Sequence, residues 1–128
     1  MKLKDFDFRI WNKHHKGCSN KDCKCQTKYV YGEETKTRLS EFKEDCEIEL
    51  FTGFYDKNGK KIYEGDILCI KQDYNKTDNG FVQYHNGILK IINKKDSHEY
   101  CVTFLCYILC KEHAEIIGNI HENAELLK

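Results

Sequence analysis

The sequence lacks an excess of charge of either sign. Lysine and arginine together number 21, and aspartate and glutamate together also number 21. A balanced chain has no overall field that would draw it to nucleic acid or to an anionic membrane, although a local basic patch is compatible with the total. Charged residues make up 33% of the chain, which is typical of a soluble surface.

Long apolar runs are also missing. No stretch approaches the roughly 20 apolar residues that a membrane-spanning helix requires, and the first residues, Met1 to Asp7, are too polar for a signal peptide. We therefore expect the protein to stay in the cytoplasm of the cell that makes it. Proline is absent altogether, and this absence points to no particular function.

Catalytic motifs are the third absence. The chain has no Gly-rich phosphate loop, no Gly-x-Ser-x-Gly elbow and no His-Glu-x-x-His pair. A Cys–His nucleophile needs a base within reach of the thiol, and nothing in the sequence places any of the candidate bases beside a cysteine, namely His85, His98, His113 and His121. Glu64 and Asp66 are better explained as hydrogen-bonding groups of a turn than as paired carboxylates. We predict that the protein is not an enzyme.

The most informative segment that is present runs from Thr52 to Leu68. Within it, Asp56-Lys57-Asn58-Gly59 predicts a four-residue turn, because aspartate bonds its own backbone two residues on and Asn-Gly tolerates positive φ. Gly65 predicts a second turn, across which Asp66 is expected to accept backbone N–H bonds before an apolar strand begins. The predicted structural turn residues are Gly53, Asp56, Gly59, Gly65 and Asp66.

Most of the remaining chain alternates with a period of two, which indicates strands. Phe6, Phe8 and Ile10 share one face of a first strand. Ile48 and Leu50 alternate with Glu47 and Glu49, which predicts a half-exposed strand.

Turn signals complete the outline of the chain. Asn86-Gly87 between two apolar runs predicts a hairpin with a type I′ turn, and residues 72–80 read as a polar tip. Residues 32–45 are ambiguous between a loop and a short helix. Cys101–Cys110 is apolar on both faces, so its period does not separate a strand from a helix. Several short strands joined by turns favour one all-β domain, a closed barrel, over residues 1–128.

Three blocks give the sequence a family resemblance. They are Phe8-Arg9-Ile10-Trp11-Asn12, the central block from Ile48 to Ile67, and the closing block from Glu115 to Leu127. In these blocks the chain resembles the YopX family of bacteriophage and prophage proteins. It departs from the family pattern at Ala124, where proline is usual, and at His121, where tyrosine is common.

The resemblance has consequences for fold and for function. It implies a small SH3-like β-barrel with an N-terminal extension and a short C-terminal helix, which Asn123 can still cap despite Ala124. The YopX family as a whole has no assigned biochemical activity, so the resemblance informs the fold more than the function.

Seven of the eight cysteines fall into two groups, and Cys46 belongs to neither. In a reducing compartment disulfides are not expected, and Cys69, Cys101, Cys106 and Cys110 lie in apolar segments that suit buried thiols.

Cysteines of the other group lie in a polar loop. The ligands that a structural zinc would use there are His15, Cys18, Cys23 and Cys25, with His14 beside them. The Cys-x-Cys spacing is tight for zinc and no second pair follows, so a loop with free thiols is the preferred interpretation. We therefore predict no metal or other cofactor, with structural zinc as the alternative.

Eight tyrosines suggest recognition, because buried hydroxyls need partners and not all of these rings can belong to a core. The leading interpretation is an accessory protein of a phage or prophage that binds a host protein, for example to inhibit a host defence system. One alternative is a nucleic-acid-binding module in which Lys90, Lys94 and Lys95 contact phosphates. Another is a self-associating structural factor. The sequence does not specify the partner or the oligomeric state.

Overall fold

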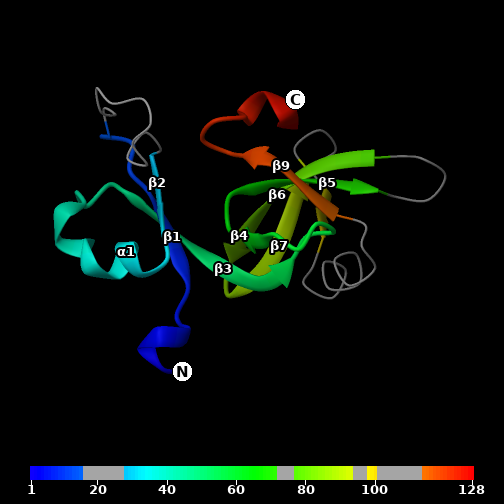
Figure 1. Ribbon diagram of the computed structural model, residues 1–128. Coiled ribbons are helices and arrows are strands. Elements are labelled where there is room, and N and C mark those ends of the chain that lie inside the picture. The colour runs from blue at the N-terminus through cyan, green and yellow to red at the C-terminus, as the bar shows by residue number, and fades with distance from the viewer. Residues whose placement is uncertain (16–27, 72–76, 94–97, 101–113) are drawn as a thin grey trace. The chain divides into compact units, whose positions relative to one another are not determined.

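The computed structural model of the chain describes residues 1–15, 28–71, 77–93, 98–100 and 114–128. Its strands are β1 (Phe8–Trp11), β2 (Tyr29–Tyr31), β3 (Glu47–Tyr55), β4 (Lys61–Tyr63), β5 (Asp66–Lys71), β6 (Thr77–His85), β7 (Ile88–Asn93), β8 (His98–Tyr100) and β9 (Ala114–Asn119). Its short helices are η1 (Leu3–Asp5), α1 (Glu33–Thr37), η3 (Leu39–Glu41) and η5 (Ala124–Leu127), where η marks a 3-10 helix. The all-β class predicted from the sequence is confirmed (Figure 1).

Contacts divide the chain into two units, Met1–Leu50 and Phe51–Lys128. The boundary falls inside β3, whose first half pairs with β1 and whose second half pairs with β4. The two units are described in turn. A single domain over residues 1–128 stays a prediction.

In the N-terminal unit, β1 is the central strand between β2 and the first half of β3. Both pairings are antiparallel, and the register places Ile10 opposite both Val30 and Ile48. One sheet face is therefore apolar, and it continues beyond the strand to Phe6, whose ring centroid lies 5.0 Å from that of Phe8. This agrees with the face predicted for Phe6, Phe8 and Ile10.

Residues 32–45, which the sequence left ambiguous between a loop and a short helix, contain both α1 and η3. Gly32 precedes α1 with a φ of 63°, a value that a side chain would disfavour. Thr35 is fully buried, and its hydroxyl donates to the carbonyl of Gly32. Arg38 then bridges the two helices, donating to Glu34 at 2.7 Å and to Glu41 at 2.8 Å.

The C-terminal unit is built on a five-stranded antiparallel sheet in the order β8-β7-β6-β5-β9 (Figure 1). Alternate residues of β5, β6 and β7 face inward together with the middle residue of β4. This core consists of Ile62, Leu68, Ile70, Val82, Leu89, Ile91 and Ala114, with Phe54 and Ile116 packed against it. Burial of each large aliphatic side chain contributes about 1.5–3 kcal/mol.

The predicted hairpin between β6 and β7 is confirmed. Asn86 and Gly87 have φ values of 53° and 79°, and they connect His85 to its pairing partner Ile88. Positive φ at both central positions is what a type I′ turn requires. The predicted polar tip over residues 72–80 is too long, however, because residues 77–80 belong to β6 and pair with β5.

A bulge bends β3 at the Thr-Gly pair. Phe51 pairs with Tyr63 and Tyr55 pairs with Lys61, so β3 uses more residues than β4 over the same span. Gly53, predicted as a turn residue, lies within the bulge of the strand at a φ of 86°, a value that a side chain would disfavour. The hydroxyl of Thr52 fills the gap, donating to the carbonyl of Ile62 at 2.7 Å.

The chain ends on β9 and η5. Leu127 is buried, and the Asn79 side chain donates to the carbonyl of Leu126 at 3.0 Å, which holds η5 against β6. The short C-terminal helix is therefore confirmed, but the predicted side-chain cap is wrong. Asn123 occupies the N-cap position and instead accepts a hydrogen bond from the backbone N–H of Asn119 at 3.1 Å. None of the described helices is long or apolar enough to cross a membrane.

Candidate functional site

Aromatic rings gather on one side of the β3–β4 hairpin in the C-terminal unit. The ring centroid of Phe51 lies 5.7 Å from that of Tyr55 and 5.7 Å from that of Tyr63. The Lys61 ammonium lies 5.2 Å from the centroid of Phe51, within the range of a cation–π interaction. We call Phe51, Tyr55, Tyr63 and Lys61 the aromatic strip.

The strip is graded from buried to exposed. Tyr63 is 6% exposed and forms its base, Phe51 is half-buried, and Tyr55 is 50% exposed. A large ring that is half in water while it packs on another ring is a common feature of recognition surfaces.

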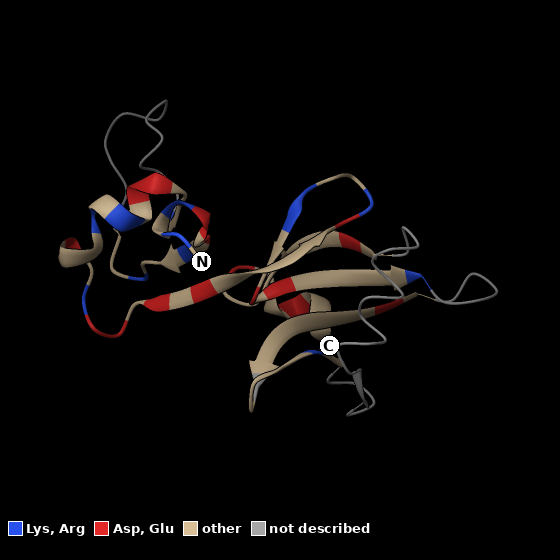
Figure 2. Ribbon diagram, turned by 90° about the horizontal axis from the view of Figure 1, so that it is seen from below, with Lys and Arg blue, Asp and Glu red and all other residues tan. Residues whose placement is uncertain are grey.

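Lysines surround the turn beside the strip. Lys57, Lys60 and Lys61 are all exposed, and Figure 2 shows blue ribbon on both sides of the β3–β4 turn. Lys57 forms an ion pair with Glu115 of β9 at 3.3 Å. Asp56 is buried in the turn, so the exposed charged groups of the turn itself are cationic.

Asp56 fixes the turn and ties it to β9. One carboxylate oxygen accepts the backbone N–H groups of Asn58 and Lys60, each at 2.9 Å, and the other accepts that of Ile116 at 3.1 Å. The backbone N–H of Lys57 also donates to the carbonyl of Ala114 at 2.9 Å. These bonds cover part of the outer edge of β9, an edge that would otherwise be open to pairing. Gly59 has a φ of 80°, and the predicted turn roles of Asp56 and Gly59 agree with this geometry.

The second predicted turn has the expected form. Gly65 has a φ of 83°, and Asp66 is buried and accepts the backbone N–H of Tyr63 at 2.8 Å. The backbone N–H of Gly65 donates to Val82, and its carbonyl accepts from Ile120. Gly65 and Asp66 therefore connect the end of β4, strand β6 and the segment after β9, which is a structural role.

A second polar cluster, the ionic cluster, occupies the N-terminal unit. Arg9 and Glu49 lie opposite each other on β1 and β3, and Arg9 Nε donates to Glu49 Oε1 at 2.7 Å. The Tyr29 hydroxyl donates to the same carboxylate oxygen at 2.9 Å, and the Arg9 guanidinium lies 4.2 Å from the centroid of the Tyr29 ring. The Tyr31 hydroxyl accepts from Arg9 at 3.4 Å.

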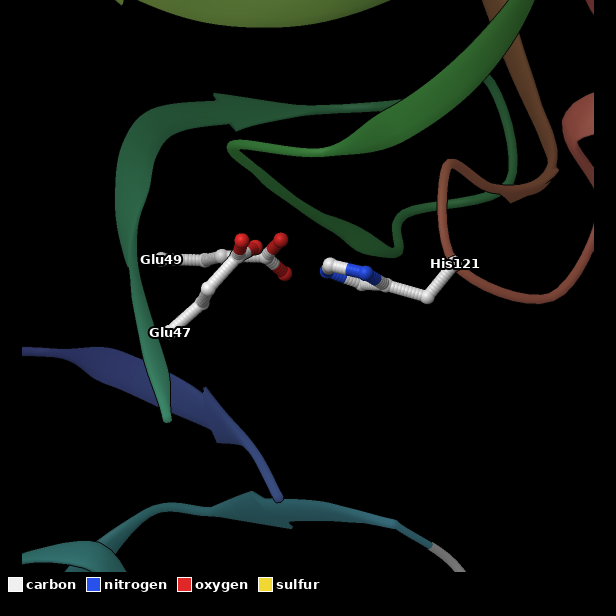
Figure 3. Close-up of side chains that lie close together, drawn as sticks. All are labelled: Glu47, Glu49 and His121. Atoms are coloured by element: carbon white, nitrogen blue, oxygen red, sulfur yellow. The ribbon is translucent and has the colours of Figure 1, made fainter. Parts of the chain in front are cut away.

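The burial of Glu49 corrects a prediction. The strand Glu47–Leu50 was expected to be half-exposed, because Ile48 and Leu50 alternate with Glu47 and Glu49. In such a strand one face carries the apolar residues and the other face carries the glutamates. Instead Glu49 is 4% exposed, Ile48 is 57% exposed, and only Glu47 is exposed as an alternating strand predicts. Glu47 and Glu49 extend from the same side of β3 (Figure 3). The partner of Glu49 is 40 residues away in sequence, which local periodicity cannot detect.

An exposed carboxylate is also held in the N-terminal unit. Asp45 accepts from His14 Nε2 at 2.7 Å and lies 3.1 Å from Lys13 Nζ. The hydrogen bond from His14, followed by that from Lys13, lowers the pKa of Asp45 from 3.8 to about 2. The group is a solvated ion pair, since the side chains of Asp45 and Lys13 are both about half exposed.

The predicted zinc ligands fall largely outside the described residues, since Cys18, Cys23 and Cys25 lie there. Of the nearby histidines, His14 bonds Asp45, whereas His15 Nε2 is buried without a hydrogen-bond partner in the described part of the chain. Among described cysteines, Cys46 and Cys69 are both free and half-buried. Cys69 therefore agrees only in part with the buried thiol expected there, and Cys101, Cys106 and Cys110 lie outside the described residues.

The tyrosines divide as expected between core and surface. Among those whose side chains are described, Tyr29 and Tyr63 are buried, and Tyr31, Tyr55 and Tyr84 are exposed by 47%, 50% and 36%. Partial burial, and then the charge of Glu64, raises the pKa of Tyr84. Of the lysines predicted to contact phosphates, Lys90 is half-buried on β7, and Lys94 and Lys95 lie outside the described residues.

Sequence reasoning found Tyr55 as one tyrosine among eight but missed its partners. Phe51, Gly53 and Tyr55 are two residues apart along one strand, and this spacing was the signal available. The bulge at Gly53 and the register with β4 bring Phe51, Tyr55 and Lys61 together, and neither can be read from spacing alone.

Comparisons with known proteins agree with the fold. A family model described as "YopX protein" matches residues 6–128, nearly the whole chain. The chain is similar to the crystal structure of protein EF1440 from Enterococcus faecalis, with a TM-score of 0.54 and 22% identity over 96% of this chain and 98% of that one. At that identity the likeness shows the fold alone. No curated protein matches the chain.

Proposed function

The chain belongs to the YopX protein family, and we propose that it is a non-catalytic accessory protein of a phage or prophage that binds a host protein. Inhibition of a host defence system is the example we favour. The observation that carries the proposal is the aromatic strip, in which Tyr55 is 50% exposed while its ring packs on Phe51. Exposed tyrosines that are held in place are the side chains that most often dominate binding at protein interfaces.

The test is affinity purification of the tagged full chain from the bacterial host, followed by mass spectrometry. We expect one host protein in stoichiometric amount. Replacement Tyr55→Ala should reduce its recovery by about tenfold or more, since truncation of a central interface tyrosine costs on the order of 2 kcal/mol.

Tyr84→Ala is the matched control, because Tyr84 is an exposed tyrosine of the same unit that lies outside the strip. It should leave recovery unchanged, and thermal unfolding should show that both variants remain folded. If Tyr55→Ala recovers as much of the host protein as the unaltered chain does, the aromatic strip is not the binding surface. Absence of any stoichiometric host protein would remove the function itself.

Nucleic-acid binding is the alternative that exposed aromatic residues also allow, because bases stack on tyrosine rings. Binding to nucleic acid weakens steeply with salt, roughly in proportion to the number of phosphate contacts. An affinity for single-stranded DNA that falls in this way would favour the alternative over the proposal. Self-association is tested separately, by light scattering at high protein concentration.

A further inference from the structure

We infer that Asn86 is a site of spontaneous covalent modification, at which the chain loses the side-chain amide and acquires aspartate or isoaspartate. This modification is separate from the proposed function, and it lies on the β6–β7 hairpin (Figure 1). The sequence contains three Asn-Gly pairs, Asn58-Gly59, Asn79-Gly80 and Asn86-Gly87. Because glycine has no side chain to hinder an attack by its backbone nitrogen, each pair is reactive in an unfolded chain. The structure distinguishes the three.

The reaction joins the backbone nitrogen of the glycine to the side-chain carbon of the asparagine. The glycine N–H loses its proton to solvent, the nitrogen attacks Cγ, and a new C–N bond closes a succinimide ring while the amide C–N bond breaks. The amide leaves as ammonia, taking a proton back from solvent. Water then adds to one of the two imide carbonyls and breaks a ring C–N bond, which leaves either aspartate or isoaspartate. Water is the only co-reactant, and no atom is oxidised or reduced.

The Asn79-Gly80 pair is fixed within the sheet. The Asn79 side chain donates to the carbonyl of Leu126 at 3.0 Å, and Gly80 is buried in β6, where it pairs with Leu68 of β5. Rotation of the peptide between Asn79 and Gly80 would therefore disrupt the β5–β6 ladder. The ring cannot close here while the sheet is intact.

The Asn58-Gly59 pair is held by the β3–β4 turn. The Asn58 side chain donates to Glu115 Oε1 at 3.3 Å, and the backbone N–H of Gly59 donates to the carbonyl of Asp56 at 3.0 Å. Both reacting groups are thus engaged, the amide as a donor to a carboxylate and the attacking nitrogen as a donor to a carbonyl. These bonds have to break before the ring can close.

The reacting groups of the Asn86-Gly87 pair are not engaged in this way. Asn86 and Gly87 are both exposed at the end of the hairpin. Within the part of the chain that the structure describes, neither the Asn86 side chain nor the backbone N–H of Gly87 makes a hydrogen bond. The amide is therefore free to turn toward the backbone, and water reaches both groups.

The turn itself offers a path to the reactive conformation. Ideal type I′ and type II′ turns share φ at the first central residue, but ψ there is about +30° in type I′ and about −120° in type II′. Rotation of the single peptide between Asn86 and Gly87 converts one type into the other and leaves the pairing of His85 with Ile88 in place. At the type II′ value the nitrogen of Gly87 eclipses Cβ of Asn86, so Cγ comes within its reach. Glycine permits the change in the sign of φ that this rotation needs at position 87. Type II′ favours glycine at the first central position, so the reactive state is a minor one and the reaction is slow.

The test is incubation of the folded full chain at mildly alkaline pH, followed by digestion with a glutamate-specific protease and mass spectrometry. Cleavage after glutamate places Asn58 on the peptide 50–64 and places Asn79 and Asn86 on the peptide 65–99, where fragmentation separates them. We expect conversion at Asn86 to be about tenfold or more faster than at the other two sites, because each of those needs hydrogen bonds to break first. Both aspartate and isoaspartate should form, since direct hydrolysis of the amide would give aspartate alone.

Incubation in guanidinium chloride is the control for the role of the fold. There the three sites should convert at rates within about threefold of one another, because no folded contact distinguishes them. Equal rates at the three sites in the folded chain would overturn the inference. Faster loss at Asn58 or Asn79 than at Asn86 would also overturn it, as would a product without isoaspartate.

Gly87→Ala tests whether the turn glycine supplies the attacking nitrogen. It should slow conversion at Asn86 by about fivefold or more, since a Cβ at position 87 hinders the attack and disfavours the turn. Gly59→Ala is the matched control, because Gly59 is also a turn glycine with positive φ that follows an asparagine, and it should leave the rate at Asn86 unchanged. Thermal unfolding shows whether both variants fold. An unchanged rate at Asn86 in folded Gly87→Ala would overturn the inference, and if that variant does not fold, the comparison of the three sites in the unaltered chain decides.

Discussion

Arg9 is a buried charged residue whose stability in the strand depends on its neighbours. Its guanidinium is 4% exposed in the middle of a strand, where an isolated charge would be very unfavourable. Glu49 supplies the opposite charge at 2.7 Å, and the rings of Tyr29 and Tyr31 lie 4.2 and 5.9 Å away. The charge is thus paired and in contact with aromatic rings, which weakly hydrated guanidinium groups tolerate well.

We predict that the Arg9–Glu49 pair is strongly coupled. Arg9→Met or Glu49→Met alone should lower the free energy of unfolding by about 3–5 kcal/mol, because each leaves the other charge buried without its partner. The double variant Arg9→Met/Glu49→Met should be destabilised by much less than the sum. Urea unfolding of the three variants measures this double-mutant cycle, and additive losses would show that the pair is not coupled.

Asp45 gives a prediction about pH. Its pKa is lowered to about 2, first by the hydrogen bond from His14, so its contribution to stability is present above pH 3.8 and is lost as the pH falls toward 2. NMR titration should therefore find the Asp45 midpoint well below 3.8, and His14→Ala should move it back toward that value. If the Asp45 midpoint is the same in the His14→Ala variant, the lowered pKa is due to Lys13 and not to His14.

The β3–β4 turn is the element on which the candidate site depends. Its sequence specifies the local conformation, with Asn58-Gly59 as the flexible part and Asp56 as the internal acceptor. The same aspartate reaches across to Ile116 of β9. A single carboxylate therefore shapes the turn, holds it on the sheet and positions the aromatic strip beside it.

We expect Asp56→Ala to lower the free energy of unfolding by about 2–4 kcal/mol, because it removes the acceptor of three backbone N–H groups, of which that of Ile116 lies on β9. Asp56→Asn should lose less, since an amide retains one acceptor oxygen. Asp45→Ala is the exposed control and should lower stability by clearly less than Asp56→Ala does, because solvent screens its ion pairs. Thermal or urea unfolding gives the comparison. A loss with Asp56→Ala no larger than that of the control would show that the turn does not depend on this carboxylate.

The whole sequence has eight cysteines, whereas the core cluster described in the C-terminal unit consists of aliphatic side chains. The described cysteines, Cys46 and Cys69, are free thiols. The C-terminal unit is stabilised by the buried aliphatic residues of β4 to β7 and by the hydrogen bond from the backbone N–H of Ile116 in β9 to Asp56.

We therefore predict that reduction leaves stability unchanged. The melting temperature of the full chain should be the same with and without an excess of dithiothreitol, within the error of the scan. A single structural disulfide contributes about 2–4 kcal/mol, so its reduction would lower the melting temperature by several degrees. A decrease of that size would reveal a disulfide among the cysteines outside the described residues.

The sequence by itself determined the features that are local. The type I′ turn at Asn86-Gly87 and the turns at Asp56 and Gly65 were predicted because positive φ and side-chain-to-backbone bonds act within a few residues. The all-β class followed from the two-residue period of the strands.

Only the tertiary structure decided which residues meet. It buried Glu49 against an arginine 40 residues away, and it placed Phe51 beside Tyr55 and Lys61. The first outcome depends on a partner distant in sequence, which sets the free energy of burying the charge, and the second depends on the bulge in β3 and on its register with β4. Local pattern specified the strands and turns, and packing between them created the candidate site.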